Sequence, residues 1–362
     1  MNVLLLGASG AVGRRTAAEL VRSPEVDRMT LAGRDRAILQ ALVDRLRGRA
    51  ALALESFDIL DPGLADRMSG HDVVVSCAGP GTELEVPCVD AAIQAGVSYL
   101  SLNDDLEPLG DVAARDAEAK VAGVTVVSGC GAAPGISNLL MTLAATELDS
   151  VDEVEVAFAA SSADAGGPAG DLHFLAMLDR AARERDFGDG ARAPHPVYFP
   201  EPVGWVETFG CGHPEAMAAF RSRPDLSAFS FRIGLGEKAV MDAVRAAIAS
   251  RITTGDRSRR IWLKAANPLR PLLEKVSPGA GAWTALRTDV RGRSAGKTRT
   301  ISLGVVDHLV NLASIPLAQA ALSWSSVGPG VFTPDQAFPA KPFLRAVAGR
   351  GIRFARLEPH AL

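Results

Sequence analysis

Short apolar runs alternate with amphipathic, helix-length stretches through the N-terminal part of the chain. In the first helix-length stretch the apolar positions, among them Val12, Ala17 and Leu20, fall on one side of a helix. The runs themselves are continuously apolar, which is typical of strands covered on both faces. Strands separated by helices predict a parallel, doubly wound sheet. The predicted strands are Val3–Leu6, Met29–Ala32, Leu52–Phe57, Val73–Cys77, Val97–Leu100 and Thr125–Ser128.

The pattern changes after Pro134. Val154–Ala160 alternates between polar and apolar residues, as in an antiparallel strand with one solvated face, and Phe229–Ile233 and Thr300–Val306 also read as strands. Helical stretches lie between them, so this middle region is predicted to be an α+β domain. From His308 to Val327 the pattern returns to a helix.

Composition narrows the classes of protein that fit. A chain of 362 residues suggests about two domains, and 48% hydrophobic with 22% charged residues is globular. The net charge of -4 offers no basic excess for a phosphate backbone, so no nucleic-acid partner is expected. The longest apolar stretch, Leu309 to Val327, is interrupted by Asn311, Pro316 and Gln319. These polar and helix-breaking positions are costly in lipid, so we expect no membrane span.

The cysteines give no sign of metal or disulfide chemistry. They stand at positions 77, 88, 130 and 211, and no two of them form a CxxC pair. We therefore expect no metal site. Unpaired cysteines are typical of a reducing compartment, which predicts a cytoplasmic protein.

A glycine-rich turn is the strongest local signal. It joins the first predicted strand to the first predicted helix, the context in which such a turn binds a dinucleotide. Gly7 permits the tight turn, Gly10 lets the backbone approach a pyrophosphate, and Gly13 lets helix and strand pack closely. The helix N-terminus then offers free N–H groups to the phosphates. The residues of the turn are Gly7, Ala8, Ser9, Gly10, Ala11, Val12 and Gly13.

The end of the second predicted strand selects the nucleotide. Arg34 stands where an NAD enzyme usually carries an acid, and a guanidinium suits a 2′-phosphate, which favours NADP over NAD. Asp35 follows directly, and its carboxylate would favour NAD. Alternatively, Arg34 is a solvated surface residue that binds no nucleotide. Ligands bind at the carboxyl ends of the strands, so further cofactor contacts are expected after the third and fourth strands. These are Asp58, Ile59, Cys77, Ala78 and Gly79.

Taken together, three further segments resemble the saccharopine dehydrogenase-like oxidoreductases. They are Cys77-Ala78-Gly79-Pro80, Ala91–Tyr99 and Gly129–Asn138. The resemblance implies a Rossmann dinucleotide-binding domain, a substrate domain with a mixed sheet, and C-terminal helices that return to the first domain. We accordingly expect a Rossmann domain over residues 1–135, an α+β substrate domain over 136–306, and a C-terminal segment over 307–362 that packs back on the Rossmann domain.

The same resemblance implies a pyridine-nucleotide oxidoreductase. Members act on amine and imine carbons, and another branch looks like enoyl reductases that reduce C=C bonds of polyketide intermediates. Many members carry an Asp directly after the strand that ends here in Tyr99-Leu100. This chain has Ser101 at that place, with Asp104 and Asp105 just beyond. The resemblance therefore does not by itself supply a catalytic carboxylate for this chain.

Hydride transfer depends mainly on positioning, and an imine nitrogen must also be protonated. Asp104 and Asp105 follow the fifth predicted strand at the edge where substrates sit, although Asp is also common in turns and helix caps. Tyr198 lies in a Pro-rich segment, His195–Pro202, that we expect to be a loop near the substrate. A cluster of arginines that includes Arg259 is either an anion-binding surface or a solvated face.

The sequence therefore predicts an NADP-dependent oxidoreductase that reduces an imine, or oxidises the matching amine, of a small amino-acid-like metabolite. The catalytic candidates are Asp104, Asp105 and Tyr198. One alternative is an enoyl reductase acting on a C=C bond of a polyketide or lipid intermediate. Another is a non-catalytic NADP-binding sensor or scaffold. The expected partner is a small-molecule substrate. The sequence does not decide between a monomer and a homodimer.

Overall fold

The computed structural model describes residues 1–105, 108–164, 168–183, 194–266, 268 and 281–358. The chain divides into two compact units, and each is built from two separate stretches of sequence. The first unit comprises Met1–Leu139 and Val310–Arg350. The second comprises Leu140–Leu309 and Gly351–Leu362.

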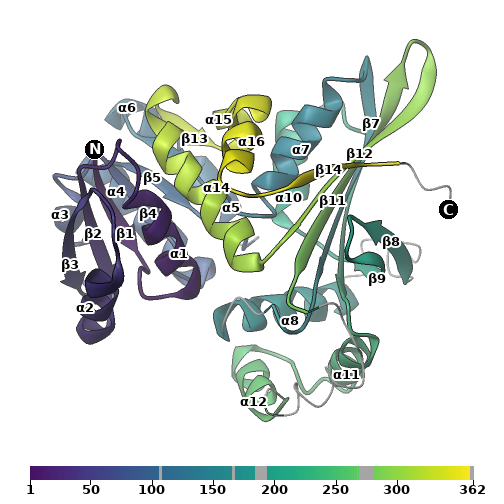
Figure 1. Cartoon of the computed structure of the whole chain (residues 1–362), viewed down its shortest axis with the longest axis horizontal. Helices are drawn as coiled ribbons and strands as arrows, with labels where there is room; N and C mark the ends of the chain where they lie inside the picture. The colour runs from purple at the N-terminus through teal and green to yellow at the C-terminus, as the bar shows by residue number, and fades with distance from the viewer. Residues whose placement is uncertain (106–107, 165–167, 184–193, 267, 269–280, 359–362) are drawn as a thin grey trace. The chain divides into compact units, whose positions relative to one another are not determined.

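The first unit contains a seven-stranded sheet in the order β13-β6-β5-β4-β1-β2-β3, and every pairing in it is parallel. This confirms the predicted doubly wound sheet (Figure 1). The strand order reverses between β1 and β4, which is where doubly wound sheets bind their ligands. The strands are β1 (Asn2–Leu6), β2 (Arg28–Gly33), β3 (Ala51–Ser56), β4 (Val73–Ser76), β5 (Ser98–Ser101), β6 (Thr125–Val127) and β13 (Gly330–Phe332).

Both faces of this sheet are covered, as the continuous apolar strands predicted. Leu4 and Leu6 of β1 pack in one hydrophobic core, and Val3 and Leu5, on alternate positions, are equally buried. The helices of the unit are α1 (Ala11–Leu20), α2 (Arg36–Arg45), α3 (Leu64–Met68), α4 (Gly81–Ala95), α5 (Leu109–Ala114), α6 (Asp116–Ala122), α14 (Leu309–Ser323), α15 (Pro334–Ala337) and α16 (Ala340–Gly349), with a short 3-10 turn, η2, at Trp324–Ser326. Helix α7 (Ile136–Ala145) carries the chain into the second unit.

The C-terminal helices return to the first unit, as the resemblance implied. Strand β13 extends the sheet by pairing with β6, with Val331 opposite Val126. The hydroxyl of Thr125 donates to the carbonyl of Gly328 at 2.9 Å, and the N–H of Val331 donates to the Asp116 carboxylate at 3.0 Å. These bonds fix the returning segment on the edge of the sheet.

The second unit contains a mixed seven-stranded sheet in the order β14-β12-β11-β7-β10-β9-β8. Strands β7 and β10 pair in parallel and the other pairings are antiparallel. This confirms the mixed sheet. The strands are β7 (Ser150–Ala160), β8 (His195–Phe199), β9 (Gly204–Gly210), β10 (Ala228–Leu235), β11 (Thr284–Ser294), β12 (Lys297–Asp307) and β14 (Phe354–Leu357). The helices wholly within it are α8 (Pro168–Arg183), α10 (Pro214–Ser222), α11 (Lys238–Ala249) and α12 (Asp256–Ala266).

Two details differ from the sequence expectations. The expected C-terminal segment ran to the end of the chain on the first domain, but the first unit ends at Arg350, and β14 pairs with β12 of the second sheet. The backbone groups along the edge of β12 gain partners in this way. The segment that contains Tyr198 is also not a loop, because His195–Phe199 forms β8. Its Pro196 is tolerated there because β8 is the last strand of the sheet.

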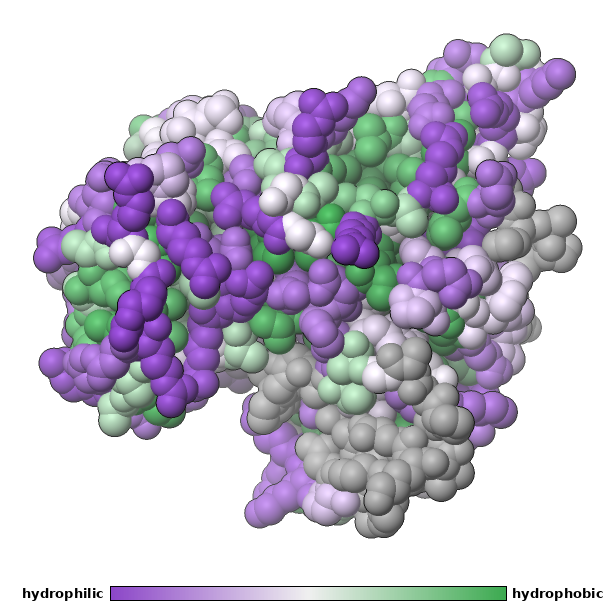
Figure 2. Space-filling view, in the orientation of Figure 1, coloured by the Kyte–Doolittle hydropathy of each residue, from purple (hydrophilic) through white to green (hydrophobic). Residues whose placement is uncertain are grey.

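Among the described residues, no helix is long and apolar enough to cross a membrane. Figure 2 shows hydrophobic residues interrupted by hydrophilic ones over both units on the face that it draws. Helix α14, which begins the longest apolar stretch of the sequence, has eight buried residues and belongs to the core instead.

Candidate functional site

The glycine turn has the geometry that its sequence predicted. Gly7 has φ +70, and a Cβ on it would lie 2.8 Å from the backbone of Cys77 and Ala78. A Cβ on Gly13 would lie 2.2 Å from the carbonyl oxygen of Gly7. Glycine is therefore required at both positions, because one needs a left-handed backbone and both bring backbones into contact.

The N-terminus of α1 is open to an anion. Gly10 is the N-cap and provides no side-chain cap, so the first N–H groups of the helix have no intrahelical partner. Arg14 donates to the carbonyl of Ser9 at 2.8 Å, which adds a positive charge beside the turn. A Cβ on Gly10 would come no nearer than 3.4 Å to the surrounding atoms, so this glycine leaves room rather than filling it. These residues fit the pyrophosphate of a dinucleotide.

Arg34 and Asp35 have different roles after β2. Asp35 is the N-cap of α2, and its Oδ1 accepts the N–H groups of Ala37 at 2.9 Å and Ile38 at 3.0 Å. One oxygen of its carboxylate therefore serves as a helix cap. The Arg34 side chain is exposed and makes no hydrogen bond or ion pair with the residues that the structure describes. Its carbonyl is held by the Ser56 hydroxyl at 2.8 Å.

The other predicted cofactor contacts lie at the same edge of the sheet. Asp58 and Ile59 follow β3, and the Asp58 Oδ1 accepts the N–H of Leu60 at 3.0 Å, which makes a local turn. Cys77, Ala78 and Gly79 follow β4. Burial raises the pKa of the Cys77 thiol to about 12, despite its contact with Thr16. Cys77 is therefore a neutral thiol at physiological pH rather than a nucleophile.

The loop after β5 packs closely against the start of α4. The Asp105 Oδ2 accepts the N–H of Thr82 at 3.1 Å, and the Asn103 Oδ1 accepts the N–H of Asp105 at 3.3 Å. A Cβ on Gly81 would lie 1.9 Å from that Asn103 oxygen, so glycine is needed for this approach. Asp104 lies between Asn103 and Asp105. The structure thus places both candidate aspartates at the carboxyl end of β5, and Asp105 also serves as a cap for α4.

A buried carboxyl group, which the sequence analysis did not single out, lies beside this loop. Glu85 on α4 is only 3% exposed. It accepts hydrogen bonds from Ser101 at 2.6 Å, Ser128 at 2.7 Å and Tyr99 at 2.9 Å. Burial raises the pKa of Glu85, the three hydroxyls oppose that shift, and the charge of Asp105 adds to it.

A signal for Glu85 was present in the sequence. Glu85 stands between the apolar residues Leu84 and Val86, and a charged residue buried in such a stretch needs hydrogen-bond partners. Its partners come from separate strands, so the sequence alone did not reveal them.

Tyr198 belongs to the second unit. Its hydroxyl donates to Glu201 at 2.5 Å, and its carbonyl accepts from Arg287 at 2.8 Å. The hydrogen bond to Glu201 raises the pKa of the Tyr198 phenol. The residues of the glycine turn, Arg34, Asp104 and Asp105 all lie in the first unit.

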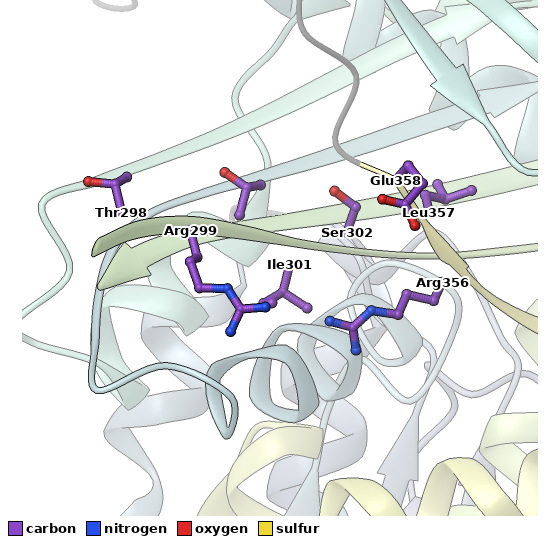
Figure 3. A pocket seen from close by; sticks show the side chains of 8 residues that line it. Thr298, Arg299, Ile301, Ser302, Arg356, Leu357 and Glu358 are labelled. Atoms are coloured by element: carbon purple, nitrogen blue, oxygen red, sulfur yellow. The ribbon is translucent and has the colours of Figure 1, made fainter. Parts of the chain in front are cut away.

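A groove of about 540 Å³ runs along β12 and β14 of the second unit (Figure 3). Arg299 and Arg356 extend toward the same side of it. Arg356 makes two hydrogen bonds to Glu147, at 2.7 and 2.9 Å, and these lower the pKa of the Glu147 carboxyl. Because Arg356 is paired and no predicted site residue lines the groove, we do not assign the reaction to it.

One arginine of the predicted cluster has a defined partner. Arg259 forms an ion pair with the buried Asp179 at 2.9 Å, which ties α12 to α8. This arginine therefore has a structural partner within the second unit.

With the fold and these contacts established, comparison with known proteins identifies the first domain. Residues 3–127 match the family model "Saccharopine dehydrogenase NADP binding domain". The resemblance inferred from the sequence is therefore confirmed for this part of the chain, which has a Rossmann fold and is similar to that family of domains.

Particular relatives extend this result to the fold. The saccharopine dehydrogenase (L-Glu forming) of Saccharomyces cerevisiae superposes with a TM-score of 0.67 at 17% identity, over 99% of this chain and 100% of that one. An amine dehydrogenase from Mycobacterium smegmatis gives a TM-score of 0.53 at 13% identity, over 93% and 96% of the two chains. At these identities the likeness shows the fold alone.

A trans-acting enoyl reductase of Mycobacterium leprae is 29% identical over 140 residues, which are 36% of this chain and 32% of the relative. The chain thus spans about a third of the length of this curated relative.

Proposed function

We propose that the protein is a cytoplasmic, NADP-dependent oxidoreductase that reduces the C=N bond of an imine, or oxidises the matching amine, in a small amino-acid-like metabolite. The observation that carries the proposal is the open N-terminus of α1 behind Gly7 and Gly13, with the unpaired Arg34 side chain after the neighbouring strand. Asp35 caps α2 through its Oδ1, which orients its carboxylate toward the helix. This arrangement favours a 2′-phosphate over a free hydroxyl.

NADPH, when bound, supplies the hydride for the substrate carbon. The chain's own contribution is to orient the substrate and to hold a proton for the imine nitrogen. Asp104 and Asp105 are the proposed residues for this step, because their loop lies at the carboxyl end of β5, next to β4 in the sheet. An oxygen of Asp105 also accepts the N–H of Thr82. Tyr198, which lies in the second unit, stays a predicted catalytic residue.

A second candidate is reduction of a C=C bond in an enoyl intermediate. The likeness to a trans-acting enoyl reductase favours it. Such a reaction also takes a hydride on one carbon and a proton on its neighbour, so the same cofactor residues serve both reactions. An apolar substrate would distinguish it from the amino-acid-like substrate of the first proposal.

The first experiment is a titration of the purified protein with NADPH and with NADH, followed by nicotinamide fluorescence. We expect tighter binding of NADPH. Equal affinities would contradict the NADP preference. Failure to bind either nucleotide would contradict the proposal that the protein is an oxidoreductase. Oxidation of NADPH is then measured with imines formed from 2-oxo acids and amines, and with enoyl thioesters. Turnover of the thioesters alone would replace the first proposal with the second.

A further inference from the structure

The buried carboxyl group of Glu85 joins one helix to the ends of two strands. Ser101 is the last residue of β5 and Ser128 directly follows β6, and both hydroxyls donate to the same oxygen, Oε1. We propose that Glu85 is a positioning residue: it holds these two strand ends and thereby sets the place of Asp104 and Asp105. Its role in catalysis rests on the proposed function, whereas its hold on the loop rests on the contacts alone.

A closed path of hydrogen bonds connects Glu85 with the aspartate loop. The Ser101 Oγ donates to Glu85, and it accepts a hydrogen bond from the N–H of Asn103 at 3.4 Å. Asn103 accepts the N–H of Asp105, and Asp105 accepts the N–H of Thr82 at the start of α4. The path begins and ends on α4, so the loop from Leu102 to Asp105 is held by the helix at both of its ends. Asp104 lies inside this path.

The end of β6 is tied into the same arrangement. The Cys130 N–H donates to the carbonyl of Ser101 at 2.8 Å, and Ser128 donates to Glu85. Loss of the Glu85 side chain would leave the hydroxyls of Ser101, Ser128 and Tyr99 buried without this acceptor, which is costly. The strand ends would then move to find other partners, and the aspartate loop would move with them.

The hydroxyl groups around Glu85 carry this hold. The groups that face it are Tyr99 and Ser101 from β5, Ser128 and Cys130 from the β6 end, Cys88 from α4, and Asp105 from the loop. Burial and the charge of Asp105 raise the pKa of Glu85, whereas the three hydroxyl donors oppose that rise. A glutamine at this place keeps a carbonyl oxygen for both serines and carries no charge.

The first test compares Glu85→Ala and Glu85→Gln with Glu83→Gln, an exposed glutamate on the same helix. In NADPH-dependent imine reduction we expect Glu85→Ala to lower kcat about 100-fold with an unchanged KM for NADPH, because displacement of the proton donor does not affect the glycine turn. Glu85→Gln is expected to rescue kcat, and Glu83→Gln to equal the wild type. Where Glu85→Ala does not fold, Ser101→Ala carries the same expectation. Unchanged kcat in both Glu85→Ala and Ser101→Ala would overturn the proposal.

The second test needs no substrate. Amide hydrogen exchange at Asn103 and Cys130 is compared in the wild type, Glu85→Ala and Glu85→Gln at a single pH. We expect protection to fall in Glu85→Ala and to be retained in Glu85→Gln. Equal protection in the wild type and Glu85→Ala would overturn the proposal. The expected loss of protection in a protein that reduces no imine would refute the proposed reaction and leave the hold of Glu85 on the loop established.

Discussion

The glycine turn and the Glu85 cluster lie in the same unit and are built in opposite ways. The turn is a run of consecutive residues, and its critical contacts, such as that between Gly13 and the Gly7 carbonyl, are made by the backbone. The cluster brings together Glu85, Tyr99, Ser101 and Ser128 from one helix and the ends of two strands, and its contacts are made by side chains. The comparison teaches that the geometry of a glycine turn can be predicted from local sequence, whereas the contacts of a buried carboxyl group depend on its surroundings in the fold.

The largest effect is expected where the turn is broken. Gly13→Val places a side chain against the Gly7 carbonyl, from which even a Cβ would be 2.2 Å away. We expect the free energy of unfolding to fall by about 3 kcal/mol and nucleotide binding to be lost. Chemical denaturation and NADPH titration measure both quantities. Gly110→Ala is the matched control, since a Cβ there meets no atom within 4 Å. A stable, NADPH-binding Gly13→Val variant would show that close packing at this point is not required.

A smaller and more selective effect is expected at Arg34, which is proposed to select the nucleotide. Arg34→Glu should weaken NADPH binding about 100-fold and NADH binding about threefold or less, because only NADPH carries the 2′-phosphate. The dissociation constants of both nucleotides are measured by fluorescence. Arg28→Glu makes the same charge change at the other end of β2 and should affect neither. Equal losses for the two nucleotides would exclude Arg34 as the residue that recognises the phosphate.

The free energy of unfolding should depend on pH through the buried carboxyl group of Glu85. Burial raises the pKa of Glu85 in the folded protein above its value in the unfolded chain, so the folded state binds this proton more tightly. The stabilisation is therefore fully present below the unfolded pKa and is lost as pH rises through the folded pKa, by up to about 1.4 kcal/mol per pH unit. Urea unfolding across this range should show a decline in the wild type that Glu85→Gln lacks. A wild type and a Glu85→Gln variant with parallel curves would mean that Glu85 does not titrate in this way.

The smallest effect concerns the acid beside Arg34. Asp35→Ala removes the N-cap of α2 and should lower the free energy of unfolding by about 1 kcal/mol, whereas Asp35→Asn should retain most of the cap. The ratio of NADPH to NADH affinity is expected to stay unchanged in both variants, because the carboxylate is bonded to Ala37 and Ile38. A marked change in that ratio would indicate that Asp35 also binds the ribose.

Much of the first domain could be predicted because its patterns are local. Continuous apolar runs indicate strands covered on both faces, and β1, β2 and β4 lie where such runs were found. The second sheet was harder to predict. Gly204–Gly210 and Thr284–Ser294 gave no clear strand signal, and His195–Phe199 was wrongly expected to be a loop because of Pro196. On an edge strand the missing N–H of a proline costs little, and only the pairing of the whole sheet shows which strand is at the edge.

The sequence by itself determined the doubly wound sheet, the glycine turn and the position of Arg34 directly after β2. Each of these follows from the spacing of neighbouring residues, which constrains the backbone locally. Only the tertiary structure decided that Asp35 is a helix cap, that β14 pairs with β12, and that Glu85 holds the ends of β5 and β6. The physical reason is that a hydrogen bond to a buried side chain depends on which groups folding brings within reach. For Glu85, Ser101 and Ser128, that proximity is created by the parallel sheet and not by the order of residues in the chain.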